Sequence, residues 1–269
     1  MSKEVAAAVT RCMDGAMSII ATSKKKDSWS ESVTSILELA AAYATTGKDQ
    51  SVARAVINRA IEYLLVEKDT IRMESCTMLG WCVGYLVESC KPAVSILKKK
   101  GKHHNNGGGA ANNNGTKRTN DATAGWKLEC LIDIGKALQP RLTDKIAKVR
   151  NAAISACVPL FSDGATSTVV DTTTTADSKN FEVIINSIQN TLVWIMANDT
   201  SAPNRALVAA QCCGRSVSKE TIPYVIERVK DVDVKVREAA LDSLRENVNL
   251  DDLTEDQRVE ILRYGLTKR

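Results

Sequence analysis

Aspartate and arginine recur in this chain at one fixed spacing, with five residues between them. The three pairs are Asp144 and Arg150, Asp199 and Arg205, and Asp231 and Arg237. A row of such groups could bind a charged ligand, or the carboxylates and guanidinium groups could pair with one another inside the fold. In stacked helical pairs, side chains of this kind typically bridge one repeat to the next and satisfy helix ends. We therefore interpret these six residues as a structural ladder.

The residues around these pairs repeat as well. Counted from each aspartate, one apolar residue lies six positions earlier and another lies eight positions later. The first set is Leu138, Val193 and Val225, and the second is Ala152, Leu207 and Ala239. An apolar helix, a turn with aspartate and a second apolar helix, repeated roughly every 30 to 50 residues, are typical of an α-solenoid of HEAT type. We predict an all-α HEAT-repeat solenoid, a fold that usually binds partners and does not catalyse reactions.

Further basic residues stand at equal offsets from two of the aspartates, an arginine three positions before and a lysine four positions after. They are Arg141 and Lys148 in one repeat and Arg228 and Lys235 in another. Equal offsets in a solenoid place side chains in one row, so these residues could form a basic ridge that binds phosphate. They could also be a solvated charged face, and the middle repeat interrupts the row with Met196 and Pro203. Both interpretations stay open at this point.

Motifs for catalysis are missing from the sequence. Gly135-Lys136 lacks the earlier glycine of a phosphate-binding loop, and neither HExxH nor GxSxG occurs. The two histidines, His103 and His104, are adjacent, which excludes zinc sites of the His-rich kind. We expect no enzymatic activity, no cofactor, no metal and no small-molecule substrate. The eight cysteines form no C-x-x-C pair, and we expect buried thiols in a reducing compartment.

The composition fits closely packed helices. Of the 269 residues, 44% are hydrophobic and only 4% are aromatic, so small and aliphatic side chains must form the core. The net charge of +4 comes from the tract 98–121, which holds six Lys or Arg and one Asp and so carries +5. The rest of the chain has a net charge of −1. A nucleic-acid site outside the tract must therefore come from the placement of charge and not from its total.

Apolar patterns divide the chain into three parts. Residues 1–97 predict helices at about 3–22, 28–44, 51–66 and 70–97. We interpret this part as a degenerate repeat, because its aspartate and arginine, Asp69 and Arg72, are three residues apart. Residues 98–125 form a basic loop of low complexity that we expect to be disordered, either a solvated insertion or an arm that attracts nucleic acid. HEAT repeats follow over 126–269, with a polar insertion at 162–180.

The two ends of the chain give further expectations. Thr254 and Gln257 form a capping box for a last helix that has no partner helix after it. We therefore expect the chain to be the N-terminal part of a longer protein. Near the start, MSKEVAAAVT is followed by Arg11 and Asp14, and we expect neither a signal peptide nor a membrane span.

Two segments resemble one protein family. RLTDKIAKVRNAAI at 141–154 and the stretch 222–269, which ends in QRVEILRYGLTKR, are similar to the N-terminal region of the G-type HEAT subunit of condensin, also called condensin subunit 3. The order of Arg-x-Lys-Asp, Val-Arg, a helix with a short acidic linker, and QRVxxLxxGL is much more specific than HEAT periodicity. The resemblance extends over about 128–269 and is only topological before residue 98.

The resemblance implies a non-enzymatic scaffold of the ATP-driven complex that compacts mitotic chromosomes. Members of this family curve around a segment of the kleisin subunit, through which they join the SMC ATPase subunits, and hold double-stranded DNA in a basic groove. With the family's basic positions added, the expected DNA-binding residues are Arg141, Lys145, Lys148, Arg228, Lys230 and Lys235. The implied location is the nucleus and mitotic chromosomes, with a cytoplasmic pool in interphase left open. The alternative is a generic HEAT scaffold of transport or phosphatase type that binds peptides and no DNA.

The two polar tracts, 98–121 and 162–180, are predicted to be dispensable for folding. Neither has apolar periodicity, and doubling the length of a surface loop costs only about 0.6 kcal/mol. Replacing each tract with a short Gly-Ser linker should leave the melting temperature, followed by circular dichroism, nearly unchanged. A loss of several degrees would mean that the replaced tract packs on the helices.

Overall fold

Helices make up all of the regular structure in the described part of the chain. The structure is a computed structural model that describes residues 2–22, 30–46, 50–90, 122–161, 175–212 and 221–265, and no strand occurs within these segments. The α-helices are α1 (Ser2–Thr22), α2 (Ser30–Thr46), α3 (Gln50–Tyr63), α4 (Asp69–Cys90), α5 (Ala122–Leu142), α6 (Ala147–Cys157), α8 (Thr175–Asn198), α9 (Ala202–Leu207), α10 (Ile222–Arg228), α11 (Val234–Asn247) and α12 (Glu255–Gly265). Two 3-10 turns, η3 (Val158–Phe161) and η5 (Leu250–Asp252), and a π-helical turn, η4 (Val208–Cys212), complete the elements.

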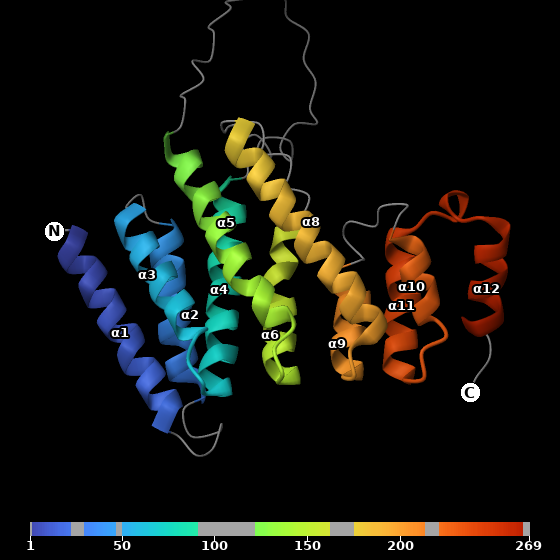
Figure 1. Cartoon of the computed structure of the whole chain (residues 1–269), viewed down its shortest axis with the longest axis horizontal. Helices are drawn as coiled ribbons and strands as arrows, with labels where there is room; N and C mark the ends of the chain where they lie inside the picture. Colours follow the sequence, from blue (N-terminus) through green and yellow to red (C-terminus); the bar gives the residue numbers. More distant parts are fainter. Residues whose placement is uncertain are drawn as a thin grey trace, which may run out of the picture.

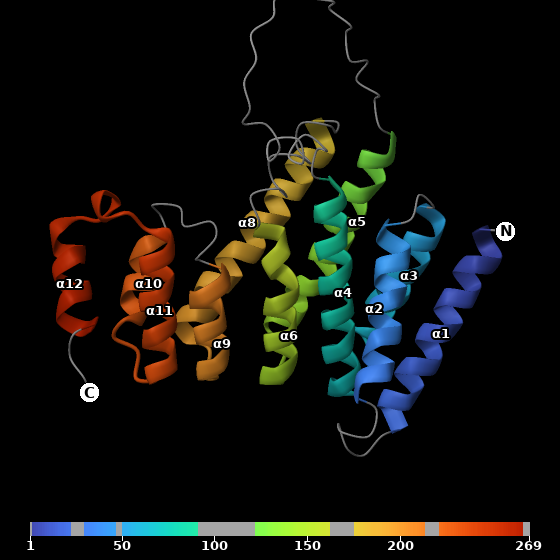
Figure 2. The same cartoon turned by 180° about the vertical axis from the view of Figure 1, so that it is seen from behind.

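The helices form two layers that run along the long axis of the molecule (Figure 1). One layer contains α1, α3, α5, α8, α10 and α12, the other contains α2, α4, α6, α9 and α11, and each helix contacts the next one in its own layer. The view from behind shows the same succession (Figure 2). Among the described connections, four turns lead from a helix of the first layer to one of the second, namely α3 to α4, α5 to α6, α8 to α9 and α10 to α11. All four lie along one edge, the lower edge in Figure 1.

Small residues let the helices approach closely, as the low aromatic content requires. A Cβ atom added to Gly80 in α4 would lie 2.9 Å from the Cα of Ala156 in α6. A Cβ added to Gly135 in α5 would lie 2.8 Å from a methyl group of Ile184 in α8. Contacts this short are not tolerated, so both glycines are needed for the distance between their helices. One continuous apolar core joins the layers from Met13 to Leu253.

Helix α1 is long and apolar enough to cross a membrane, judged by length and composition alone, and it lies near the N-terminus. In this fold its apolar stripe is covered. Met13, Ala16, Met17 and Ile20 are buried in the core, and the helix packs on α2 and α3. The structure thus uses α1 as the outer helix of the first pair.

Several predicted boundaries were wrong. The third helix ends at Tyr63 and not at residue 66. The predicted end of the fourth helix at residue 97 lies outside the described residues, which reach Cys90. The predicted loop 98–125 is helical from Ala122, and the predicted insertion 162–180 is helical from Thr175. The first turns of α8 are polar and their described side chains are exposed or half-buried, so they show no apolar period, although Asp177 is favourable near the positive end of a helix. The tracts 98–121 and 162–174 lie outside the described residues.

The cysteine prediction holds for four of the five described thiols. Cys76, Cys82, Cys130 and Cys157 are buried, but Cys12 is exposed on α1, where the prediction was wrong. Burial raises the pKa of the Cys76 and Cys82 thiols to about 12 and that of Cys130 to about 11. These thiols therefore stay protonated at neutral pH and act as small apolar groups. The side chains of Cys90, Cys212 and Cys213 are outside the described set.

Gly80 and Gly84, one helical turn apart on α4, should respond in opposite ways to alanine. At Gly80 the new methyl group meets the backbone of Ala156, so Gly80→Ala should destabilise the fold by about 1–3 kcal/mol. At Gly84 nothing lies within 4 Å, and Gly84→Ala should stabilise it by up to about 1 kcal/mol through helix propensity. Urea unfolding of both variants measures the difference. Equal effects would mean that α4 and α6 are not in close contact at Ala156.

Candidate nucleic-acid interface

The charged residues predicted from the repeat gather on the edge formed by the four turns. Arg150 donates hydrogen bonds from Nε (2.7 Å) and Nη2 (2.6 Å) to the carboxylate of Asp199 and from Nη1 (2.8 Å) to the main-chain carbonyl of Asp144. Arg205 repeats this arrangement, with 2.9 Å and 2.7 Å to the carboxylate of Asp231 and 2.7 Å to the carbonyl of Asp199. Each arginine therefore joins its own turn to the carboxylate of the next repeat. We call this set of interactions the ladder.

Each ladder aspartate also shapes its own turn. One carboxylate oxygen of Asp144, Asp199 and Asp231 accepts a hydrogen bond from the backbone N–H two residues later, at 3.0, 2.7 and 3.0 Å. These Asx turns direct the chain into the second helix of each pair. A short carboxylate is required, because the same group must reach the local N–H and the arginine of the preceding repeat.

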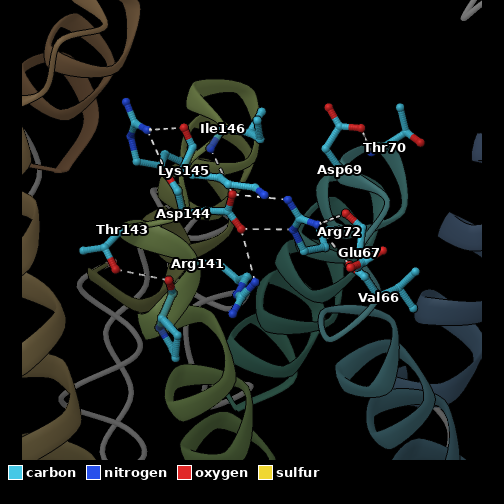
Figure 3. Close-up of polar contacts among 12 residues, drawn as sticks. Val66, Glu67, Asp69, Thr70, Arg72, Arg141, Thr143, Asp144, Lys145 and Ile146 are labelled. Atoms are coloured by element: carbon cyan, nitrogen blue, oxygen red, sulfur yellow. Dashed lines mark hydrogen bonds and ion pairs between the residues drawn. The ribbon is translucent and has the colours of Figure 1, made fainter.

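A fourth arginine, Arg72, belongs to the ladder, but its partner is Asp144 and not Asp69, with which the sequence paired it. Arg72 is buried and donates from Nε (3.0 Å) and Nη2 (3.3 Å) to the carboxylate of Asp144. Its Nη1 donates to the carbonyls of Val66 (3.0 Å) and Glu67 (Figure 3). Arg72 thus bonds as Arg150 does, one repeat earlier.

The interpretation of Asp69 as the aspartate of that first repeat is wrong. Asp69 is exposed and accepts from the N–H of Thr70 at 2.9 Å, at the start of α4 (Figure 3). The position six residues before Arg72 is Val66, where only the backbone carbonyl is used. A signal was present, because Ile71-Arg72 matches Val149-Arg150 and Val236-Arg237. The first part of the chain is therefore joined to the regular repeats by the same ladder.

A buried amide adds a second link between α6 and α9. Asn204 donates to the carbonyl of Ala147 (3.1 Å) and to Asp199 (3.1 Å), and it accepts from the amide of Asn151 (3.0 Å). Nothing in the sequence pattern pointed to this residue, which occupies a position that is valine in the neighbouring repeats. At the far end Arg237 donates to the carbonyls of Asp231 (2.9 Å) and Val232 (3.2 Å). Among the described residues, no carboxylate accepts from it.

Three of the six residues predicted to bind DNA are paired with carboxylates. Arg141 donates to Asp144 at 3.1 Å and Arg228 to Asp231 at 3.5 Å, and their side chains are only 24% and 19% exposed. Lys230 is bridged by Glu227 (3.2 Å) and Glu260, and lies over the ring of Tyr264.

The other three lysines are exposed. Lys145 lies in the turn between α5 and α6, Lys148 in the first turn of α6, and Lys235 in the first turn of α11. No ion pair involves their ammonium groups within the described segments. All three lie on the same edge as the ladder. Lys148 and Lys235 occupy equivalent positions two repeats apart, and the repeat between them has Pro203 at that position. DNA binding by these residues stays a prediction, and the geometry favours the three lysines over Arg141, Arg228 and Lys230.

The ladder aspartates have shifted acidities. Burial alone would raise the pKa of Asp199, but hydrogen bonds from Arg150, from the N–H of Ser201 and from Asn204 outweigh it, so the pKa is lowered. The pKa values of Asp144 and Asp231 are lowered for the same balance of reasons. All three carboxylates are therefore charged at neutral pH. No cluster of three or more potential metal ligands occurs among the residues described.

Comparison with known proteins gives the fold but no sequence relative. Neither a protein-family model nor a curated protein sequence matches this chain. Among solved structures, a chain in the crystal structure of the S. pombe condensin Cnd3-Cnd2 subcomplex aligns with 94% of this chain at a TM-score of 0.58 and 21% identity. The aligned region spans 26% of that longer chain. An engineered protein aligns over 94% of this chain and 85% of its own, but at a TM-score of only 0.40 and 12% identity. The prediction of an all-α fold of packed helical pairs, resembling HEAT-repeat proteins, is confirmed.

Arg72 and Asp69 should differ strongly in their contribution to stability. Arg72→Ala leaves the buried carboxylate of Asp144 with only Arg141 as a basic partner, and should reduce the free energy of unfolding by about 3 kcal/mol. Asp69→Ala removes an exposed group at the start of α4 and should cost less than about 1 kcal/mol. Urea unfolding of the two variants provides the measurement. A larger effect at Asp69 would contradict the ladder as described.

Acid should weaken the ladder. Because the folded-state pKa of Asp199 lies below the value of about 3.9 for a free aspartate, its contribution to stability is present above pH 4 and is lost as the pH falls further. The melting temperature should be nearly constant from about pH 8 to pH 5 and should fall below about pH 4. The Asp199→Asn variant should have a lower melting temperature than the unchanged protein at neutral pH, and its melting temperature should fall less in acid. The same acid-induced loss in both proteins would exclude Asp199 as a source of the effect.

Proposed function

We propose that this chain is a non-enzymatic scaffold of a condensin complex, which binds the kleisin subunit and double-stranded DNA. The observation that carries the proposal is the alignment of 94% of the chain with part of a chain from a condensin subcomplex. The motifs at 141–154 and 222–269 support the same family. Through the kleisin the chain would join the SMC ATPase subunits, and it would act in the nucleus on mitotic chromosomes.

The arrangement of charge suits weak DNA binding without sequence preference. Lys145, Lys148 and Lys235 project from turns and first helical turns that the ladder holds in place, so the backbone that carries them loses little freedom on contact with phosphates. The tract 98–121 adds a net charge of +5. Contacts of both kinds would be to the backbone, which is the same in every sequence, and their strength would fall as salt rises.

One observation favours the alternative of a protein-binding scaffold that does not bind DNA. Outside 98–121 the chain has a net charge of −1, and the charges of Arg141, Arg228 and Lys230 are compensated by neighbouring carboxylates. Of the six residues predicted to bind DNA, only Lys145, Lys148 and Lys235 are exposed without a carboxylate partner among the described residues. They are therefore the residues to test.

Replacing the exposed lysines should weaken DNA binding. Lys145→Glu, Lys148→Glu and Lys235→Glu combined should lower the affinity for a duplex equally for all sequences. The combined change should also reduce the slope of log affinity against log salt by about two to three units, because each phosphate contact releases about one counterion. Fluorescence anisotropy with two unrelated duplexes measures both quantities. A variant with Lys3, Lys136 and Lys179 changed to Glu is the matched control, because these lysines are also exposed but lie within α1, α5 and α8 and not at the turns of the ladder edge.

Equal affinity and slope in the triple variant and the unchanged protein, with an intact fold, would refute DNA binding at this edge.

Co-expression with the kleisin subunit encoded in the same genome tests the other half of the proposal, which is binding to the kleisin. A stable complex with this chain is expected. Failure to co-purify would contradict the kleisin assignment even if DNA binds.

A further inference from the structure

A groove lies between α8 and the beginning of α10, on a part of the molecule that the ladder does not use. Its volume is about 710 Å³. One wall is a stripe along α8 in steps of three and four residues, and the other wall is Thr221 and Tyr224. The residues of α8 that line it are Asn186, Gln189, Asn190, Val193, Trp194, Ala197 and Asn198. None of the lining residues is charged.

Of the four amide side chains of this stripe, only that of Asn198 has a described partner, the carbonyl of Trp194 at 3.0 Å. Asn186, Gln189 and Asn190 make no hydrogen bond to other described residues, whereas the amides of Asn204 and Asn151 pair with each other in the core. Each free amide offers both donors and an acceptor. A row of uncharged amides is complementary to an uncharged ligand whose hydrogen-bond donors and acceptors alternate.

The aromatic side chains of the groove are exposed. Trp194 is 56% and Tyr224 is 51% exposed, in a chain with few aromatic residues. Exposed aromatic side chains bordered by polar groups are typical of sites that bind protein segments. Their flat faces can cover the apolar side chains of a bound segment.

We infer that this groove binds an extended, uncharged peptide segment of a protein partner. The main chain of the segment would pair with the amides of Asn186, Gln189 and Asn190, and its apolar side chains would lie on Trp194 and Tyr224. From residue 186 to 197 the stripe rises about 16 Å, the length of about five residues of extended chain. A helix would not suit the row of amides, because its own backbone groups are already paired. A nucleic acid would not suit it, because no lysine or arginine lines the groove.

This inference deepens the proposed scaffold function and rests on it for the existence of a protein partner. It assigns that partner a binding segment of defined chemistry. It also assigns a different ligand to each surface. The ladder edge would bind phosphate through positive charge, and the groove would bind peptide through amides and aromatic rings.

A random eight-residue peptide library displayed on phage and selected on the full chain tests the inference. Enriched peptides should be uncharged at their centre and carry aromatic or aliphatic residues at alternate positions. For the best of them, synthesised with a fluorophore, Trp194→Ala and Asn190→Ala should each weaken binding about tenfold or more in fluorescence polarisation. Tyr43→Ala, which removes an equally exposed aromatic ring from α2, is the control and should leave binding unchanged. The affinity should not depend on salt, in contrast to that for DNA.

Absence of enrichment, binding that is unaffected by Trp194→Ala, or enrichment of charged peptides with salt-dependent affinity would overturn the inference. These outcomes leave the proposed function standing if the chain still binds DNA and co-purifies with the kleisin. Peptide binding at the groove in a chain that does neither would instead retain the inference and refute the proposed function. Both groove residues are exposed, so the variants should keep the melting temperature of the unchanged protein.

Discussion

The ion pair between the arginine of one repeat and the buried aspartate of the next is the interaction on which the rest of the structure depends. The carboxylates of Asp144, Asp199 and Asp231 are between 2% and 5% exposed. A charge buried to this extent is costly unless it is paired and fully hydrogen-bonded, and one displaced repeat would leave it unpaired. The ladder therefore penalises every alternative register of the stack. We attribute to it the specificity of the arrangement more than its net stability, which comes from the apolar core.

The ladder also determines which charges remain for a ligand. Arg141 and Arg228 stand at offsets that suggested a phosphate-binding ridge, yet each donates to the carboxylate that the ladder has placed beside it. What remains on this edge is a small set of exposed lysines at turns whose geometry the aspartates fix. The groove between α8 and α10 depends on the same stacking, because its two walls come from successive repeats. A fixed stack thus presents exposed lysines on one surface and uncharged amide and aromatic side chains on another.

Much of this could be predicted from the sequence, and the failures have physical reasons. The spacing of Asp144 and Arg150 predicted helical pairs, because apolar residues recur around it. Arg72 was paired with Asp69 because the position six residues before it is Val66, so the spacing of aspartate and arginine that marks the other repeats is missing there. The groove could not be predicted either, because the sequence shows the uncharged stripe on α8 but not that Tyr224 faces it.

A double-mutant cycle across one repeat boundary tests the central claim most directly. The free energies of unfolding of Arg150→Ala, Asp199→Ala and the double variant are compared with that of the unchanged chain. The account predicts a coupling of at least about 2 kcal/mol, with the double variant more stable than the sum of the single effects implies, because removing both partners leaves no buried charge unpaired. Additive effects, with a coupling near zero, would contradict it and would mean that the apolar core alone sets the register of the repeats.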